Sequence, residues 1–283
     1  MKDESGIHSH NSKVIIVAGP TAVGKTAYAV RLALELGTEI VSCDSRQFYR
    51  ELNIGVARPS DEELAAVQHH FIACRSVTEP YNIFDYHRDA TELINRLIET
   101  HGCAIVVGGS GLYIDALLNG VSRMPDPTPE LRASLQQMPI EEKRALLLKL
   151  DPDYYAVVDL RNPVRLQRAL EVCITAGKPY SSFRKVEGGT LKAEEISIVK
   201  LELPNTELRA RIDRRVDAMM QSGLIDEVRS LLPYRDLPTL RTVGYRELFP
   251  VLDGTADIAD AVAQIKLNTW HYARKQLTWL RSH

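Results

Sequence analysis

The sequence predicts a doubly wound α/β protein, in which helices cover both faces of a mostly parallel sheet. Three observations carry this prediction: short apolar runs that end in glycine, helix-period segments that alternate with them, and a glycine-rich loop between the first run and the first helix. Strands that are apolar throughout are typical of parallel sheets, because both faces of such sheets are buried. With 283 residues, of which 45% are hydrophobic, the chain is long enough for one large core or for a core with a smaller appended domain.

The first half of the chain alternates strand and helix. Residues 13–20, KVIIVAGP, form a continuous apolar run closed by glycine and proline, which predicts a buried strand. Residues 25–37 follow with helical spacing and end in glycine, as helices commonly do. Further strands are predicted at 39–45 and 103–111, the latter after helical sequence at 84–102.

The second half is mostly helical. Proline-bounded helices are predicted within 126–155, and an amphipathic helix is predicted within 162–180. The core-facing positions of that amphipathic helix are Leu166, Leu170 and Ile174. This part of the chain is therefore expected to be inserted into the α/β core or packed on it.

The last part of the chain returns to the core. A strand at 196–204 is predicted to rejoin the sheet, a helix follows with Asn205 as its N-cap and Gly223 at its end, and a long helical stretch covers 257–283. We therefore divide the chain into an α/β core, a helical insertion, and a closing part that completes the core. These three parts are residues 13–122, 123–190 and 191–283.

Composition excludes several classes of protein. The net charge is −2, no run of eighteen apolar residues occurs, and the N-terminal MKDESGIHSHNSK has no apolar stretch behind its charges. We expect neither a signal peptide nor a membrane span, and a cytoplasmic location. The four cysteines have no CxxC pair and no zinc-finger spacing, which argues against a disulfide framework or a structural zinc site. A local basic excess in 161–246 is compatible with a polyanionic partner.

A phosphate-binding loop is the strongest motif of the chain. The stretch GPTAVGKT matches G-x-x-x-x-G-K-[ST] and lies between a predicted strand and a predicted helix. The glycines let backbone amides surround phosphate oxygens, the helix start contributes its positive end, and the lysine adds a full charge. The residues predicted to bind phosphate are Gly19, Pro20, Thr21, Ala22, Val23, Gly24, Lys25 and Thr26. Thr26 is also the predicted ligand of Mg²⁺.

The chain lacks a feature that a nucleotide hydrolase needs. Such an enzyme places an acidic residue at the end of a later apolar strand, but the obvious strand here ends in Gly108 and Gly109. A carboxylate occurs instead as Asp44, at the predicted carboxyl end of the strand that follows the loop, where ligands bind in open α/β sheets. Asp44 and Ser45 could also be a helix N-cap, but the adjacent phosphate loop favours a catalytic Asp44.

Six stretches together resemble bacterial tRNA dimethylallyltransferases. They are GPTAVGKT, DSRQFY, VGGSGLY, NPVRLQRALEV, RTVGYRE and ARKQLTWLR, and their order and approximate spacing match that family over nearly the whole chain. The resemblance implies a core like that of the P-loop kinases and a monomer. It also implies transfer of a dimethylallyl group from dimethylallyl diphosphate to N6 of the adenosine 3′ of the anticodon, position 37 of the tRNA.

The resemblance assigns roles to particular residues. The loop would hold an isoprenoid diphosphate as leaving group, so that no terminal phosphate is cleaved and no hydrolytic water has to be activated. Lys25, Mg²⁺ on Thr26, and Arg215 would stabilise the departing diphosphate, and Asp44 would act as general base. The ATP-binding usually associated with such loops becomes the weaker interpretation.

The resemblance further implies contacts with the anticodon stem-loop of tRNA. Gln47 offers a donor and an acceptor to an adenine edge, and the remaining positions are carried over from the family's RNA-contacting stretches. The predicted tRNA-binding residues are Asp44, Ser45, Arg46, Gln47, Ser110, Arg132, Val164, Arg165, Leu166, Gln167, Arg168, Arg241, Thr242, Val243, Gly244, Tyr245 and Arg246.

Three other functions are weighed against this one. An isopentenyltransferase acting on free adenine nucleotides has similar chemistry, but it has no need of the helical second half. A small-molecule P-loop kinase would use Asp44 as acceptor base, and the missing second acidic residue argues against it. A tRNA-binding protein without catalysis is the remaining alternative.

Overall fold

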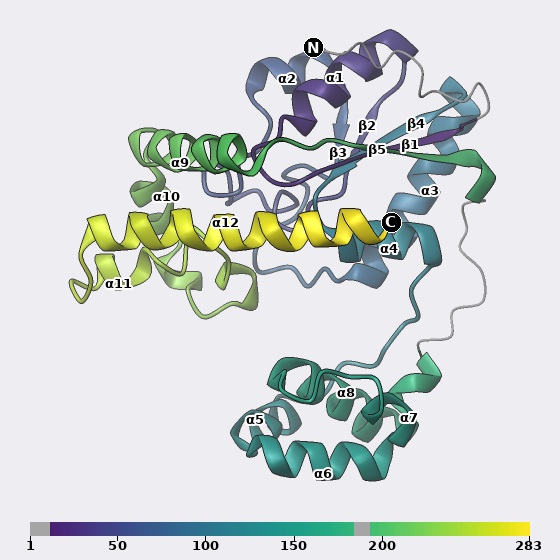
Figure 1. Ribbon diagram of the computed structural model, residues 1–283, viewed down its shortest axis with the longest axis vertical. Helices are drawn as coiled ribbons and strands as arrows, with labels where there is room; N and C mark the ends of the chain where they lie inside the picture. The colour runs from purple at the N-terminus through teal and green to yellow at the C-terminus, as the bar shows by residue number, and fades with distance from the viewer. Residues whose placement is uncertain (1–11, 184–192) are drawn as a thin grey trace. The chain divides into compact units, whose positions relative to one another are not determined.

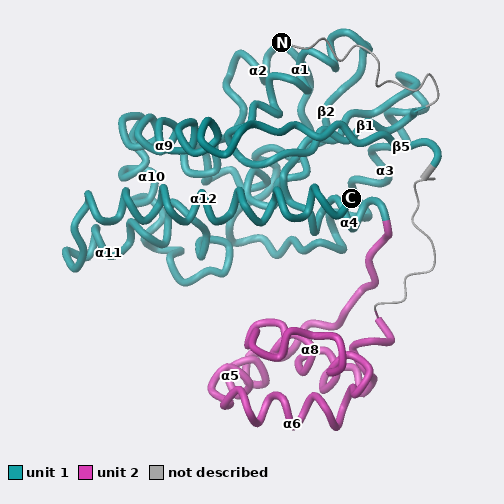
Figure 2. Tube along the Cα trace, in the orientation of Figure 1, with its two compact units in different colours: residues 1–118, 191–283 teal, residues 119–190 magenta. Residues whose placement is uncertain are grey.

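The computed structural model describes residues 12–183 and 193–283. The chain forms two compact units, residues 1–118 with 191–283 and residues 119–190, which Figure 2 colours separately. The second unit begins at 119, where the sequence predicted 123. The predicted boundary at 190 and 191 and most of the N-terminal segment lie outside the described residues.

The sheet of the first unit has five parallel strands in the order β3-β2-β4-β1-β5 (Figure 1). The strands are β1 (Val14–Ala18), β2 (Ile40–Ser42), β3 (His69–His70), β4 (Ala104–Gly108) and β5 (Ile196–Lys200). The predicted strands at 13–20, 39–45 and 103–111 are confirmed as the shorter β1, β2 and β4, and β5 rejoins the sheet beside β1 as predicted. The two-residue β3 was not predicted.

Helices cover both faces of this sheet. The α-helices of the first unit are α1 (Lys25–Leu36), α2 (Asp61–Ala66), α3 (Ile83–His101), α4 (Gly111–Asn119), α9 (Asn205–Gln221), α10 (Leu224–Ser230), α11 (Phe249–Leu252) and α12 (Ile258–Ser282). Three short 3₁₀ helices accompany them: η2 (Ala193–Glu195), η3 (Leu232–Tyr234) and η4 (Pro238–Leu240). In Figure 1 the long α12, in yellow, runs beside α9, and the two helices are in contact.

Two apolar cores explain why the strands are apolar throughout. Ile15 and Val17 of β1 pack in a cluster with residues of α1, whereas Val14 and Ile16 belong to a larger cluster that includes α3, α9 and α12. Alternate side chains of a strand point to opposite faces, so both faces of this strand are buried. The predicted class, a parallel α/β core with flanking helices, is confirmed.

Two helix ends illustrate local sequence signals, and one predicted cap is wrong. Gly37 ends α1 in the left-handed region, at φ 64°, and Asn82 caps α3 by accepting bonds from the amides of Phe84 and Asp85. The prediction of Asn205 as an N-cap is wrong, because Asn205 is already the first residue of α9 and Pro204 occupies the cap position. The fixed φ of proline suits a chain entering a helix.

The second unit is a helical bundle with its own core. Its helices are α5 (Pro129–Gln137), α6 (Ile140–Leu150), α7 (Pro152–Tyr155), α8 (Pro163–Ala176) and the 3₁₀ helix η1 (Tyr180–Phe183). Leu166 and Leu170 of α8 are fully buried in that core, as their spacing predicts. The same prediction is wrong for Ile174, which is 42% exposed, because the buried face of α8 passes through Val172 and Cys173 in that turn. None of the helices in the described ranges combines the length and apolar character needed to cross a membrane.

Candidate active site

The phosphate loop connects β1 to α1 at the carboxyl edge of the sheet. Gly24 occupies the N-cap position of α1 with φ 102°, a conformation that glycine adopts at little cost. Lys25 begins the helix, and its Nζ donates a hydrogen bond to the Pro20 carbonyl at 2.7 Å. The loop therefore folds back over its own lysine, as expected of a phosphate-binding loop.

A cavity of about 380 Å³ opens at this loop. Its walls come from the loop, from the ends of β2 and β4, and from α9 and α12. Of the predicted site residues, it is lined by Thr21, Ala22, Gly24, Lys25, Thr26, Asp44, Gln47 and Arg215. Residues that lie far apart in the sequence are thus collected around one space, where ligands bind in parallel sheets.

Two cations in this cavity are poorly compensated by the protein. Burial lowers the pKa of Lys25 to about 8, with Asp44 opposing the shift and Arg215 adding to it. Burial also lowers the pKa of Arg215, although Asp44 and Glu63 oppose that shift. A lowered pKa means that the charged form is destabilised where it lies. An anion bound between these two side chains would relieve that destabilisation.

Asp44 lies in a turn after β2. One of its carboxylate oxygens, Oδ1, accepts a hydrogen bond from the backbone N–H of Arg46 at 2.9 Å. The alternative interpretation, a helix N-cap, is wrong, because residues 45–48 form a turn rather than a helix. A carboxylate that bonds the amide two residues on is typical of an Asx turn. The bond fixes the orientation of Asp44 at the wall of the cavity.

Steric crowding explains the missing acidic residue at the end of β4. A Cβ atom on Gly108 would lie 2.3 Å from the Cys43 carbonyl oxygen, and one on Gly109 would lie 2.2 Å from Nε2 of Gln276. Both distances are far below van der Waals contact. The neighbouring strand and α12 approach so closely here that no side chain fits, and the hydrolytic aspartate of nucleotide hydrolases has no place at these two positions.

Gln276 is a site residue that the sequence did not reveal. Its Oε1 accepts a hydrogen bond from the Thr21 backbone N–H at 2.8 Å, and its Nε2 donates to the Gly109 carbonyl at 2.8 Å. The side chain is 7% exposed and lines the cavity. The amide therefore ties the phosphate loop to the end of β4 from the last helix of the chain.

We expect Gln276→Met to weaken the binding of inorganic diphosphate by about fivefold to about a hundredfold, because it removes two hydrogen bonds, each worth about 0.5–1.5 kcal/mol. Methionine preserves the length of the side chain and removes both bonds. The dissociation constant is measured by calorimetry for this variant and for Gln264→Met, an exposed glutamine on the same helix. Equal affinities in the two variants would show that the loop does not depend on this bridge.

A second cavity of about 290 Å³ shares wall residues with the first. The residues that line both are Thr21, Asp44, Val56, Ala57, Arg215 and Tyr272. Of the predicted residues, the second cavity is also lined by Ser45, Arg46, Ser110, Thr242, Val243 and Gly244. Its apolar walls are supplied by Val56, Val216, Met219 and Ile265. Asp44 and Arg215 therefore stand between a polar space and a more apolar one.

The segment 54–57, of which residues 56 and 57 line both cavities, is held by Glu227. Its carboxylate accepts bonds from the amides of Ile54 at 2.7 Å and Gly55 at 3.1 Å, and from the Tyr245 hydroxyl at 2.6 Å. Tyr245 is fully buried, so the structure contradicts the prediction that its side chain contacts tRNA. Its neighbours Arg241 and Arg246 are exposed. Within this stretch the aromatic residue is structural and the arginines are accessible.

Gln47 is engaged within the protein. Its Nε2 donates to the carbonyls of Val56 at 3.3 Å and Ala57 at 3.1 Å, and its Oε1 accepts from the Ser42 hydroxyl at 3.3 Å. Both ends of the amide that was predicted to read an adenine edge are therefore paired. In this structure Gln47 fastens the segment 54–57 to β2.

Aromatic packing supports the turn that carries Asp44. Phe48 is fully buried, and its ring centroid lies 5.3 Å from that of Tyr81, 5.4 Å from that of Tyr86 and 5.8 Å from that of Tyr113. Edge-on and offset contacts at such distances are favourable. The rings thus anchor the turn a few residues after Asp44.

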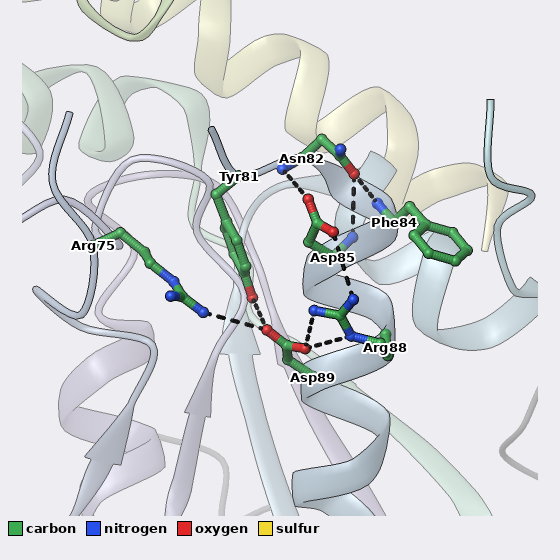
Figure 3. Close-up of polar contacts among 7 residues, drawn as sticks. All are labelled: Arg75, Tyr81, Asn82, Phe84, Asp85, Arg88 and Asp89. Atoms are coloured by element: carbon green, nitrogen blue, oxygen red, sulfur yellow. Dashed lines mark hydrogen bonds and ion pairs between the residues drawn. The ribbon is translucent and has the colours of Figure 1, made fainter. Parts of the chain in front are cut away.

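A polar network fixes Tyr81 in that cluster (Figure 3). Asp89 of α3 accepts a hydrogen bond from the Tyr81 hydroxyl at 3.2 Å and forms ion pairs with Arg88 at 2.7 Å and Arg75 at 3.5 Å. The Arg75 guanidinium also lies over the Tyr81 ring, 4.9 Å from its centroid. The network joins the segment before α3 to the helix itself and so stabilises the aromatic support of the Asp44 turn.

The predicted residues of the second unit gather around a buried glutamate. Glu171 accepts a hydrogen bond from Gln167 at 3.1 Å and pairs with Arg168 at 3.5 Å and Arg132 at 3.6 Å. The sequence did not single out Glu171. Its negative charge orients the side chains of Arg132 and Arg168, which remain partly exposed. These two arginines form a basic surface near the start of α8.

The remaining predicted positions of α8 lie on different faces of the helix, some exposed and some buried. Val164 is 74% exposed and Arg165 is exposed, whereas Leu166 has no exposed surface. The Leu166 side chain packs in the core of the second unit, as its spacing predicts, and the assignment of residue 166 to a tRNA-contacting stretch stays a prediction. Asn162 caps the helix by accepting from the Arg165 amide at 3.2 Å.

The fold and the site define a class: α/β proteins with a parallel sheet and a glycine-rich loop at the carboxyl edge of that sheet, beside a cavity. The sequence pattern of the family described as "IPP transferase" matches residues 47–283. The chain is 44% identical to a tRNA dimethylallyltransferase of Christiangramia forsetii, over 95% of this chain and 90% of that protein. It is 43% identical to tRNA dimethylallyltransferase 1 of Bacteroides thetaiotaomicron, over 95% of this chain and 88% of that protein. The chain belongs to the IPP transferase family.

Solved structures resemble the chain as well. A tRNA isopentenylpyrophosphate transferase of Bacillus halodurans matches with a TM-score of 0.68 and 33% identity, over 96% of this chain and 88% of that one. A eukaryotic dimethylallyltransferase that acts on tRNA matches with a TM-score of 0.80 and 25% identity, over 95% of this chain and 70% of that one. The chain is thus an enzyme of the prenyltransferase kind with the fold of these relatives.

Proposed function

We propose that the enzyme transfers a dimethylallyl group from dimethylallyl diphosphate to N6 of the adenosine 3′ of the anticodon in tRNA, releasing diphosphate. The observation that carries the proposal is the pair of cavities that meet at Asp44 and Arg215. One is polar and cationic and suits a diphosphate, and the other has apolar walls. The names of the relatives, tRNA dimethylallyltransferases, support the same assignment.

Lys25 and Arg215 bind the leaving group in this proposal. Both cations are desolvated in the cavity, and Asp44 offsets only part of their charge. As the bond between the allylic carbon and the diphosphate oxygen breaks, negative charge grows on the diphosphate. Cations and loop amides that are already oriented toward the diphosphate lower the activation barrier for breaking this bond, because they do not have to reorganise during the reaction.

The residues at the loop also fit Mg²⁺. In the described part of the chain no group of three His, Cys, Asp or Glu residues could hold a metal ion. Mg²⁺ at a phosphate loop does not need one, since it keeps several waters and is held by a hydroxyl and by substrate phosphates. Thr26 lines the cavity and would hold it. When bound, the ion adds positive charge that stabilises the departing diphosphate.

Asp44 is the proposed general base. The adenine amine is a poor nucleophile, because its lone pair is delocalised into the ring, and it must lose a proton as the new C–N bond forms. Asp44 lies where the two cavities meet, and its hydrogen bond from the Arg46 amide holds it there. The carboxylate takes the N6 proton while the allylic carbon bonds to the nitrogen.

Each of the two units has its own group of exposed cations that we propose as tRNA contacts. Arg241 and Arg246 flank the stretch that lines the second cavity, and Arg132, Arg165 and Arg168 form the basic surface at the start of α8. The net charge of −2 favours specific contacts over bulk attraction, so we expect a modest salt dependence of tRNA binding. We propose that the enzyme acts in the cytoplasm as a monomer.

The test is transfer of radiolabel from dimethylallyl diphosphate. The acceptors are unmodified tRNA that has adenosine at position 37, the same tRNA with guanosine there, and free AMP. We expect label in the first acceptor only, and mass spectrometry of the anticodon-loop nucleosides locates it. Label in AMP but not in tRNA would replace the proposal by a nucleotide prenyltransferase. Tight tRNA binding without transfer would replace it by a non-catalytic tRNA-binding protein, and consumption of ATP by a kinase.

A further inference from the structure

His69 occupies an unusual position in the sheet. It lies in β3, and its register partner in β2 is Ile40, which pairs in turn with Ile105 of β4, the partner of Ile15 in β1. Parallel register partners point to the same face of a sheet. The three isoleucines are buried in the cluster beneath α1. A histidine thus continues a row that is otherwise filled by isoleucine.

The hydrogen bonding of the imidazole ring defines its tautomer. Nδ1 of His69 lies 2.8 Å from the Val67 carbonyl oxygen. A carbonyl oxygen only accepts, so Nδ1 carries the hydrogen, and Nε2 of the neutral ring is an acceptor. Burial lowers the pKa of His69, which favours this neutral form.

Nε2 is an orphaned acceptor. The His69 residue is 8% exposed, and Nε2 is buried without a hydrogen-bond partner among the described residues. Buried polar atoms are nearly always paired, so an unpaired one calls for a ligand or an ordered water. His69 lines the cavity that also contains Lys25 and Thr26. The missing partner would therefore lie in the proposed diphosphate site.

The partner has to be a hydrogen-bond donor. A fully ionised diphosphate presents only acceptor oxygens, and these would repel the lone pair of Nε2. Four cationic side chains line the cavity, and none of them has a hydrogen bond to His69. Lys25 donates to the Pro20 carbonyl, and Arg215 donates toward Thr21 Oγ1 at 3.3 Å and the Ala57 carbonyl at 3.5 Å. Arg211 donates to Glu207, and Arg58 donates through Nη2 to backbone carbonyls of residues 49–52, while its Nε has no partner among the described residues. A water polarised by a divalent cation is a strong donor and is compatible with the anion beside it.

We propose that His69 is a positioning residue for the proposed Mg²⁺ and diphosphate site, where its Nε2 accepts a hydrogen bond from a water of the cation's hydration shell. This inference rests on the proposed function, because it requires a diphosphate with its cation at the phosphate loop. His69 touches neither the prenyl group nor the acceptor in this arrangement. It orients the hydrated cation, as outer-shell partners of metal sites do.

Three substitutions separate this role from a structural one. His69→Asn keeps a donor near Val67 and removes the acceptor at Nε2, whereas His69→Gln can place its amide oxygen where Nε2 was. His70→Asn is the matched control, since His70 is the adjacent residue and its Nε2 lies 2.5 Å from Glu39. The readout is the Mg²⁺ concentration that half-saturates the binding of inorganic diphosphate, measured by calorimetry without turnover, together with the melting temperature.

We expect His69→Asn to raise that Mg²⁺ concentration about tenfold. His69→Gln should stay close to the wild type, and His70→Asn should be unchanged. The role is excluded if His69→Asn leaves the Mg²⁺ requirement unchanged, or if His69→Gln is as impaired as His69→Asn. If the wild type itself shows no Mg²⁺-dependent binding of diphosphate, the proposed function fails and not His69 alone.

A measurement on the unaltered protein covers the case in which the variants do not fold. The ¹⁵N resonance of His69 Nε2 is recorded with labelled histidine before and after addition of Mg²⁺ and inorganic diphosphate. A nitrogen that gains a hydrogen bond at its lone pair shifts away from the value of the unbonded acceptor. We expect this shift only when both Mg²⁺ and diphosphate are present. An Nε2 resonance that does not move when diphosphate binds would overturn the inference.

Discussion

Replacing Asp44 by asparagine is expected to lower the rate of prenyl transfer to tRNA by about 10²–10⁴-fold, the usual contribution of a general base. Asparagine can still accept the hydrogen bond from the Arg46 amide, so the turn after β2 should persist. The binding of inorganic diphosphate should be retained or tightened, because a negative charge is removed from a cavity that already contains Lys25 and Arg215. Single-turnover kinetics with bound tRNA measure the rate, and calorimetry measures the binding.

Asp226→Asn serves as the control for this substitution. Asp226 is an exposed carboxylate in the first turn of α10, outside both cavities, and the same change there should leave the rate unaltered. An Asp44→Asn enzyme with the wild-type rate would remove Asp44 from the chemistry. A rate that falls together with diphosphate affinity would instead assign Asp44 to the organisation of the binding site.

The sequence predicted those elements whose signal is local. β1, β2 and β4 are apolar runs closed by small residues, and both α1 and α3 end at a glycine. β3 escaped prediction because a two-residue strand has no periodicity of its own and exists only through pairing with β2. A strand of this kind is therefore determined by its tertiary contacts and cannot be predicted from the local sequence pattern.

The predicted site residues share a simple geometric origin. Lys25 and Thr26 follow the end of β1, and Asp44 follows the end of β2, so a parallel sheet brings them together at one edge. Gln276 and Glu227 were missed because their roles depend on contacts across 255 and 173 residues of chain. No spacing in the sequence indicates such a pairing.

Stretches that were assigned to tRNA binding as a whole contain both exposed and buried side chains. The residues 164–168 were all predicted to contact tRNA, but a helix turns each successive side chain by about 100°. Leu166 therefore faces the core of the second unit while its neighbours Val164 and Arg165 face outward. Tyr245 illustrates the same point in a turn, since burial and a bond to Glu227 occupy its side chain. Family resemblance assigns a segment, and local geometry decides which of its side chains are accessible.

Arg215→Gln is expected to reduce the transfer rate by about 10²–10³-fold, as does removal of one preorganised donor from a site of developing negative charge. The guanidinium stands where the two cavities meet, and its bond to Thr21 Oγ1 holds it against the phosphate loop. The loss should appear both in single-turnover transfer and in the affinity for inorganic diphosphate, since the same charge serves both.

The matched control for Arg215→Gln is its neighbour in α9. Arg214 is exposed and lines neither cavity, so Arg214→Gln changes the net charge equally and should leave diphosphate affinity and the transfer rate unchanged. Arg215→Lys separates charge from shape: lysine keeps the charge but cannot reach toward Thr21 and Ala57 at once, as the guanidinium does. We expect Arg215→Lys to fall between the wild type and Arg215→Gln. Equal losses in Arg214→Gln and Arg215→Gln would mean that general attraction of tRNA, rather than the leaving group, accounts for the effect.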